Sequence, residues 1–210
     1  FVSSTVYFIG DTVVNNANHH DFKESVLIIN GNLEAQNFKS DNVSIFVNGN
    51  TSFDHFEVNN LSLYSSGTLI LTKHITISNS KIRSIGPLQV INNSNEQMKI
   101  TNSHLLMEGL NNYIESLDVK DYSTVCIKND STIDDLKIDE SSNVLILNSV
   151  KRMDYNLNST KEPILVDIDT FNKYCYAVSD SNEGIDVGII SDVYVTPESI
   201  LNEIDYDVTD

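Results

Sequence analysis

The stretch that decides the fold, residues 124–148, reads TVCIKNDSTIDDLKIDESSNVLILN. In its first strand the apolar residues Val125 and Ile127 alternate with residues of other kinds, as side chains do on the two faces of a β-strand. Polar clusters at 129–131 and 141–143 interrupt the alternation, and Asn, Asp and Ser favour turns. The stretch therefore predicts strand, turn, strand, turn, strand.

Similar phrases recur along most of the chain, at intervals of about 17 to 23 residues, a spacing typical of solenoid repeats. The alternating strands begin near Val26, Val43, Leu61, Ile82, Leu105, Val125, Val144 and Ile164. One coil of about 20 residues cannot bury its own apolar face, but a stack of coils can. We therefore predict an all-β protein, a parallel β-helix (solenoid) with capped ends and a short C-terminal helix.

Two other all-β architectures remain open from the residues alone. An antiparallel sandwich would need many tight Asn-Gly or Asp-Gly hairpins, and Asn48-Gly49 is one of the few candidates. A leucine-rich repeat would need its full Leu and Asn phrase, which Leu145, Leu147 and Asn148 only echo.

The predicted coils occupy residues 24–168. Residues 1–25 supply the first strand and an N-terminal cap, because the end of a stack exposes strand edges that must be covered. Residues 169–210 are expected to close the other end of the stack. This closing segment is predicted to contain strands at 171–178, 187–190 and 193–195 and a helix over 196–204, which Thr196 would cap and Pro197 would begin.

Asparagine is abundant and glycine is scarce, with only 8 residues, although the fold needs many corners. Asn tolerates a positive φ because its side chain is short and polar. We therefore expect Asn at left-handed corner positions, with Asn and Ser forming side-chain ladders at equivalent corners of successive coils.

The formal net charge is −17, from 30 acidic and 13 basic residues. Such a field repels phosphate groups, which argues against nucleic acid and anionic lipid as partners. No run of about 18 apolar residues exists, so we expect no membrane insertion. The chain begins with Phe1 rather than Met, which suggests a processed product or an excised fragment.

The chain has 2 cysteines, Cys126 and Cys175. Cys126 alternates with inward residues and should point outward. Cys175 should lie more than two coils further along the stack, at about 4.8 Å per coil. That separation exceeds the ~4.4–6.8 Å between Cα atoms that a disulfide needs, so we expect two free thiols.

No histidine cluster has a recognisable metal-ligand spacing, so we predict no metal and no cofactor. The run His19-His20-Asp21 has no second cluster to complete a site and is interpreted as a polar loop. His55 and His74 would titrate together only if they stacked at one corner; otherwise they, like His104, are surface residues.

The densest acidic run contains Asp134, Asp135 and Asp139, and the next coil could add charged residues to it. Glycan-cleaving enzymes need converging carboxylates, or carboxylates with Arg or Lys, on one outer face. Arg83 and Arg152 are the chain's only arginines, which weakens that hypothesis. The neighbours of the acidic run in the next coil are Lys151, Arg152 and Asp154. We interpret the acidic run as a solvated face with no catalytic residue.

Aromatic residues out of phase with the core or near turns are the candidate ligand-binding residues, because exposed aromatics on a rigid rod suit a protein or glycan contact. They are Phe46, Phe53, Phe56, Tyr113, Tyr122 and Tyr155. The competing interpretation places them in the core.

The phrases TSFDHFEVNNLSL (51–63), TISNSKI (76–82) and STIDDLKI (131–138) resemble the irregular coils of bacterial autotransporter passenger domains and related secreted β-helix adhesins. The resemblance covers about residues 24–168 and would also fit phage tailspike rods. It implies a right-handed parallel β-helix, export to a Gram-negative bacterial surface, and a role in adhesion or virulence. The scarce glycine, the two cysteines and the lack of a translocator barrel depart from that family, and no functional residue carries over.

These observations lead to one functional prediction. The chain is expected to be a secreted or cell-surface β-helix that binds a host or bacterial surface protein or glycan through a lateral face, without catalysis. It could also self-associate along the rod. The alternatives are a carbohydrate-active β-helix, such as a polysaccharide lyase or tailspike-like hydrolase, and a purely structural spacer.

Overall fold

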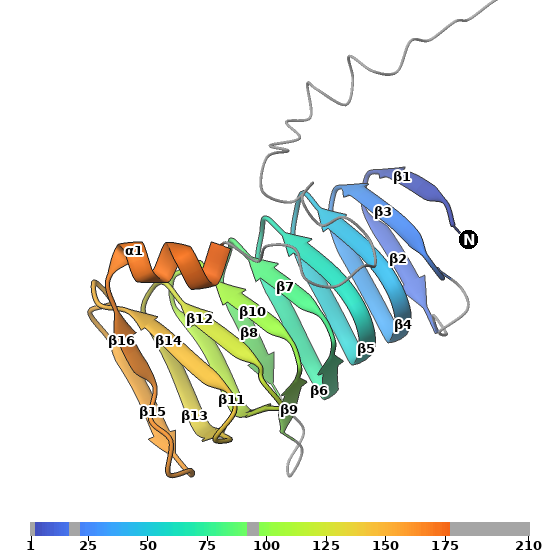
Figure 1. The fold of residues 1–210 in the computed structure, drawn as a ribbon. Helices are drawn as coiled ribbons and strands as arrows, with labels where there is room; N and C mark the ends of the chain where they lie inside the picture. Colours follow the sequence, from blue (N-terminus) through green and yellow to red (C-terminus); the bar gives the residue numbers. More distant parts are fainter. Residues whose placement is uncertain (1–2, 17–21, 92–96, 177–210) are drawn as a thin grey trace, which may run out of the picture.

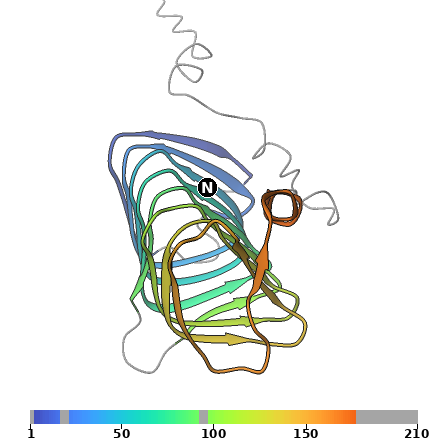
Figure 2. The same cartoon turned by 90° about the vertical axis from the view of Figure 1, so that its left-hand side faces the viewer.

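The computed structural model describes residues 3–16, 22–91 and 97–176. These residues form a parallel β-solenoid of about 8 turns with one short C-terminal helix, shown from the side in Figure 1 and along the coil in Figure 2. Strands that follow one another in the sequence do not pair as antiparallel hairpins; each pairs in parallel with the strand one turn away, as β1 does with β3. The predicted parallel solenoid is confirmed, the sandwich is excluded, and the hand of the coil stays a prediction.

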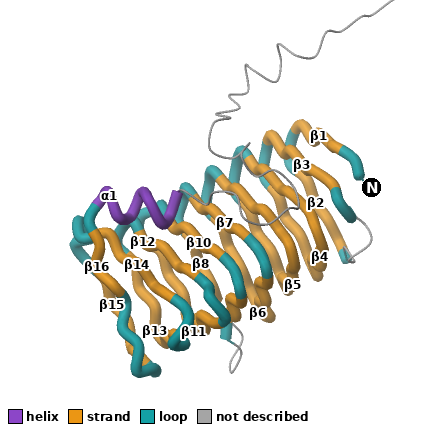
Figure 3. Tube along the Cα trace, viewed as in Figure 1, coloured by secondary structure: helices purple, strands orange, loops and turns teal. Residues whose placement is uncertain are grey.

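Each turn has three faces, which we call A, B and C, and long strands such as β4 bend from one face to the next. Face A stacks β1 (Thr5–Ile9), β3 (Ser25–Asn30), the ends of β4 (Leu33–Val47) and β5 (Thr51–Ser65), β7 (Lys81–Ser84), β10 (His104–Met107), β12 (Thr124–Ile127), β14 (Asn143–Leu147) and β16 (Ile164–Val166). Face B stacks β2 (Thr12–Asn15), the starts of β4, β5, β6 (Leu69–Ser78), β11 (Asn112–Lys120) and β13 (Ser131–Ile138), with β8 (Leu88–Ile91) and β15 (Met153–Leu157). Face C contains the later parts of β4, β5, β6, β11 and β13, with β9 (Met98–Thr101). Figure 3 shows how short loops join the strands at the corners.

The core fills the inside of the coil with side chains that alternate inward along each strand. It is made mainly of Leu, Ile and Val, and the N-terminal turns add phenylalanines that pack against one another. The Phe38 and Phe53 ring centroids lie 5.2 Å apart, and those of Phe53 and Phe56 lie 4.3 Å apart. Burial of these rings removes a large apolar area from water, which favours the stacked state over separate coils.

Glycines form a ladder at the corner between faces A and B, where successive backbones approach closely. A Cβ on Gly86 would lie 2.3 Å from the carbonyl oxygen of Gly67, and one on Gly109 would lie 2.2 Å from that of Gly86. No side chain fits at these distances. Glycine is therefore required at these corner positions, because any side chain would clash with the backbone of the neighbouring turn.

Asparagines take the left-handed positions between faces C and A, as the composition predicted. Asn60, Asn79 and Asn102 have φ values of 51°, 49° and 45°. The side chains of Asn79 and Asn102 form a ladder with that of Asn59, since Asn102 Nδ2 donates to Asn79 Oδ1 at 2.7 Å and Asn79 Nδ2 donates to Asn59 Oδ1 at 2.7 Å.

A second ladder, of buried serines, lies beside the first and satisfies backbone N–H groups at the turns. The backbone N–H of Ser80 donates to Ser103 Oγ at 2.9 Å, and that of Ser103 donates to Ser123 Oγ at 3.1 Å. The N–H of Ser123 donates in turn to Ser142 Oγ at 3.1 Å. The predicted Asn and Ser ladders are confirmed.

β1 and β2 pair in register with β3 and β4, so the described strands before residue 25 belong to the first turn of the solenoid. Within the described residues, β1 pairs only with β3, and β16 pairs only with β14, so neither end strand of face A is covered by a further strand.

The start of the predicted strand at 171–178 is helical instead. α1 (Ile168–Phe171) continues into a π-helical turn, η1 (Asn172–Tyr176), and Thr170 N–H donates to the N-cap Asp167 Oδ1 at 2.7 Å. Short helices depend on tertiary packing more than on propensity, and this one packs along the side of face A rather than across the end of the stack (Figures 1 and 2). The strands predicted at 187–190 and 193–195 and the helix predicted at 196–204 lie outside the described residues.

Candidate binding face

The two cysteines form a disulfide, which corrects the expectation of two free thiols. Cys126 points outward from β12 as predicted, and its Cα lies 5.9 Å from that of Cys175 in η1. The expectation was wrong because it placed Cys175 further along the stack. After β16 the chain turns back, and η1 returns to the level of β12.

The disulfide lies in a second apolar cluster, outside the coil and separate from its core. Phe171 and Cys175 from the helical segment pack there against outward side chains of face A, and the exposed fractions of Phe171 and Cys126 are both 0%. The cluster contains Leu106, Cys126, Leu145, Leu147, Phe171 and Cys175. The C-terminal segment therefore covers this part of face A as a second layer.

The end of the segment is held by a buried carboxylate, Glu108, whose side chain is 8% exposed. Arg83 Nε donates to one carboxylate oxygen at 2.7 Å, Lys128 Nζ donates to the other at 2.8 Å, and the Tyr176 hydroxyl donates to Glu108 as well. Burial would raise the pKa of Glu108, but the hydrogen bonds from Lys128, Tyr176 and Arg83 outweigh it and lower the pKa. Glu108 is thus an ionised anchor for the C-terminal segment.

The His104 ring contacts the backbone of the same C-terminal segment. Its Nε2 lies 3.1 Å from the carbonyl oxygen of Cys175, so the neutral ring must donate there. Burial lowers the pKa of His104 to about 4, the hydrogen bond to Cys175 partly opposes the shift, and Lys81 adds to it. Neutral His104 therefore has a structural role at physiological pH.

Face A is divided into two halves. The covered half consists of β10, β12 and β14 with α1 and η1 packed on them, and β7 lies between the two halves. The open half consists of β1, β3 and the face-A ends of β4 and β5. In the covered half consecutive residues are buried, as in Leu105, Leu106 and Met107, whereas β1 and β3 alternate. No described residue plays the part of the helical segment over the open half.

One outward column runs through both halves in register. Tyr7 pairs with Ile28, Ile28 with Phe46, and Phe46 with Tyr64. Beyond Tyr64 the same column continues through Arg83, Leu106, Cys126 and Leu145 into the covered half. We call the set Tyr7, Ile28, Phe46 and Tyr64 the aromatic column.

The outward residues of the open half carry no charge, although the chain has 30 acidic and 13 basic residues. Tyr7 and Ile9 are 56% and 76% exposed, and Ile28, Phe46 and Tyr64 are half-buried. The outward positions are Thr5, Tyr7, Ile9, Val26, Ile28, Asn30, Ser44, Phe46, Asn48, Ser62, Tyr64 and Ser66. This uncharged strip on an acidic protein is the candidate contact surface.

Of the aromatic residues predicted to bind ligand, Phe46 lies in this column, but Phe53 and Phe56 do not reach the surface. Both are 0% exposed in the core, so the core interpretation is correct for them. The reason is the corner at His55, whose φ of 62° turns the chain so that both rings point inward. Strict alternation would have placed them on opposite sides of one strand.

The other predicted aromatics lie apart from the column. Tyr113 is on face B, where its hydroxyl donates to Asp134 at 2.7 Å, and this hydrogen bond raises the pKa of Tyr113 to about 12. Tyr122 is 80% exposed at a corner with φ 64°, and Tyr155 is 39% exposed in β15. The predicted residues therefore do not form one site. What was missed is the register, which aligns Tyr7, Ile28 and Tyr64 with Phe46.

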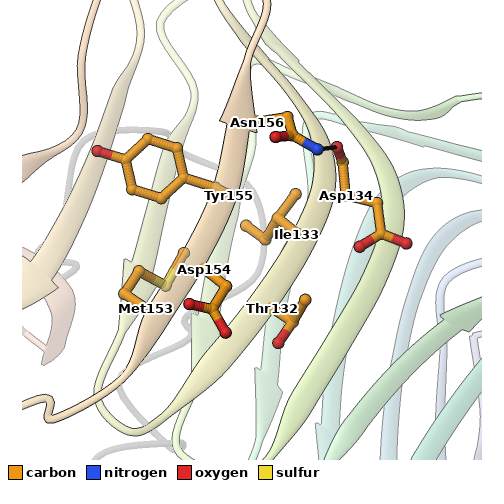
Figure 4. A pocket seen from close by; sticks show the side chains of 7 residues that line it. All are labelled: Thr132, Ile133, Asp134, Met153, Asp154, Tyr155 and Asn156. Atoms are coloured by element: carbon orange, nitrogen blue, oxygen red, sulfur yellow. Dashed lines mark hydrogen bonds between the residues drawn. The ribbon is translucent and has the colours of Figure 1, made fainter.

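The predicted acidic run borders a shallow concavity of about 310 Å³ between β13 and β15 (Figure 4). Its lining includes Asp134, Asp154 and Tyr155, and Asn156 Nδ2 donates to the backbone oxygen of Asp134 at 2.8 Å. Asp154 is paired with Arg152 Nε at 2.6 Å. The pairing register of β13 and β15 shifts between Ile133 and Leu136, next to this concavity.

The nearby carboxylates are hydrogen-bond acceptors. Burial would raise the pKa of Asp135, but hydrogen bonds from Asn158, Ser116 and Gln97 lower it. Burial would also raise the pKa of Asp139, but hydrogen bonds from backbone and serine groups outweigh it and lower this pKa to about 2. Carboxyl groups with lowered pKa values are poor general acids near neutral pH, which does not favour glycan cleavage here.

Two other histidines of the described residues, His55 and His74, contact each other. They do stack at one corner, with ring centroids 5.3 Å apart. The described residues contain no group of three or more His, Cys, Asp or Glu that could hold a metal ion, and 19–21 lie outside them. Within the same residues, no helix has the length and apolar character needed to cross a bilayer.

The fold defines the chain as a parallel β-solenoid protein. Comparisons with protein families, curated proteins and solved structures find no match to it.

Proposed function

We propose that the chain is a non-catalytic binding protein whose open half of face A contacts a surface protein or glycan of a host or bacterial cell. The observation that carries the proposal is the aromatic column, an uncharged strip on a protein of net charge −17. Parallel strands hold its side chains about 4.8 Å apart on a rigid support, so little conformational entropy is lost when a ligand binds.

The disulfide supports a location outside the reducing cytosol. Cys126 and Cys175 are both buried and bonded to each other, and such bonds persist mainly in secreted and surface proteins. This fits the proposed secreted or cell-surface location, although cysteines are a departure from the autotransporter passenger rods that the coils resemble. End-to-end self-association is part of the proposal, because the described β1 and β16 each pair on one side only.

The test compares binding to intact bacterial and epithelial cells by flow cytometry, with fluorescently labelled full-length protein. The double variant Ile28→Ser/Phe46→Ser should bind at least about tenfold more weakly than wild type, because aromatic anchors dominate such interfaces. The matched control, Ile70→Ser/Ile91→Ser, removes outward isoleucines of face B and should bind like wild type. Equal binding by both variants would assign the contact to another surface. If neither wild type nor any variant binds cells, the alternative of a purely structural spacer would be favoured.

A further inference from the structure

We propose that residues 177–210 of the same chain occupy the open half of face A and compete there with the ligand. The competition rests on the proposed function, whereas the occupancy rests on the arrangement of the covered half. There the preceding residues, 168–176, already lie on the same outward column.

The last described residue stands at the boundary of the open half. The guanidinium of Arg83 lies 5.2 Å from the Tyr176 ring centroid and 5.8 Å from that of Tyr64, which is the member of the aromatic column nearest to the covered half. Arg83 and Tyr64 are paired neighbours on β7 and β5. The surface that Tyr176 contacts is therefore continuous with the open half.

The reach of the remaining chain is ample. Four strand spacings separate Arg83 from Tyr7, which is ~19 Å at ~4.8 Å each. About 34 residues follow Tyr176, and in an extended form they could span ~110 Å. The segment can therefore follow the whole column.

The open strands have the composition of strands covered on both faces. β1 reads TVYFI and β3 reads SVLIIN, with apolar residues at both inward and outward positions. β14, which α1 covers, reads NVLIL. Parallel strands with such continuous apolar runs are typically buried on both faces, so the sequence of β1 and β3 implies a covering layer.

The candidate layer has matching chemistry. Residues 187–190 read VGII and residues 193–195 read VYV, which supply apolar side chains for an uncharged strip. The segment 177–210 contains no Lys or Arg, and its apolar runs match the uncharged strip.

The experiment places a photocrosslinker in the full-length protein by Phe46→p-benzoylphenylalanine, which keeps an aromatic ring in the column. After irradiation, mass spectrometry should locate most crosslinks within 177–210 of the same chain, as judged from mixed light and heavy isotope-labelled protein. The matched control, Ile70→p-benzoylphenylalanine on face B, should give few. Crosslinks mainly between two copies would assign the strip to a dimer, and no enrichment at 177–210 would overturn the proposal.

A second variant separates this inference from the proposed function. Val187→Ser/Ile189→Ser/Val193→Ser/Val195→Ser in the full chain should lower the Phe46 crosslinks and raise cell binding about tenfold, because the competitor is weakened. Crosslinks to 177–210 without cell binding by any form would leave the occupancy standing and sink the proposed function. Cell binding that depends on Phe46, without crosslinks to 177–210, would do the reverse.

Discussion

The two halves of face A share a backbone, a register and an outward column, yet their burial differs. In the covered half Leu106, Cys126 and Leu145 are buried under α1 and η1, whereas in the open half Tyr7 is 56% exposed and Phe46 is half-buried. The strands themselves do not explain this, because β3 is as apolar as β14. The difference lies in the second layer, so the outer surface of a solenoid strand can either be buried in a second apolar cluster or stay exposed.

The covered half shows what is needed to hold such a layer. The helical segment is short, and a helix of its length is not stable alone. An apolar cluster, a disulfide and the buried Glu108 with its donors hold it together. Each contribution can be removed separately, which allows the comparison of the two halves to be tested.

The largest effect is expected from Phe171→Ala. Phe171 is 0% exposed in the outer cluster, and truncation of a buried Phe costs ~3–5 kcal/mol. The loss should appear as a lower opening free energy of residues 168–176, measured by amide hydrogen exchange. Phe46→Ala, in the same outward layer but in the open half, should leave the exchange of 168–176 unchanged. If both variants release the segment equally, the halves are not independent.

Removal of the disulfide by Cys126→Ala/Cys175→Ala should come next. The bond joins residues 49 apart in sequence, and a crosslink of this size stabilises by ~2–4 kcal/mol, mainly by restricting the unfolded chain. Urea unfolding followed by far-UV circular dichroism should show the lower midpoint. Wild type with dithiothreitol should match the variant, and identical midpoints for the variant and oxidised wild type would contradict the role assigned to the bond.

Acidification should weaken the covered half through His104. Its folded pKa of about 4 lies below the unfolded value of 6.5, so the unfolded chain binds more protons between these limits. Stability is therefore full above pH 6.5 and falls as the pH drops toward 4. Between pH 7 and 5.5 the loss from this group is about 1 kcal/mol. His104→Gln keeps an N–H donor for the Cys175 carbonyl but does not titrate, so its unfolding free energy should change less over this range; equal slopes would refute the assignment.

The solenoid could be predicted from sequence because stacking coils leaves a local signal, namely alternating strands at a regular interval with polar corners. The same local reasoning placed Asn at positive φ and Cys126 on the outside. It failed where one residue breaks the alternation. His55 turns the chain at φ 62°, and no pattern in the sequence separates Phe53 and Phe56 from the outward aromatics.

The binding face and the disulfide needed information that the sequence does not hold locally. The column from Tyr7 to Tyr64 depends on register between coils of unequal length, so its members could not be aligned by spacing alone. The helical segment folds back against face A because of contacts with Leu106 and Leu145, which lie far from it in sequence. The one sequence feature that indicated a second layer was a strand such as β14, which is apolar at both its inward and its outward positions.

The smallest effect concerns Arg83, which lies where the two halves meet. Arg83→Lys should keep the ion pair with Glu108 but lose the planar group that lies over the Tyr64 and Tyr176 rings, at a cost of ~0.5–1 kcal/mol. Lys128→Arg is the matched control, because it keeps both the charge and a contact with Tyr176, and it should cost nothing measurable. Hydrogen exchange should report the loss for Arg83→Lys at 172–176. Because Arg83 also lies over the Tyr64 ring, a smaller loss is expected at 61–65, on the open side of the boundary. Unchanged exchange at both places would contradict the role assigned to the Arg83 guanidinium.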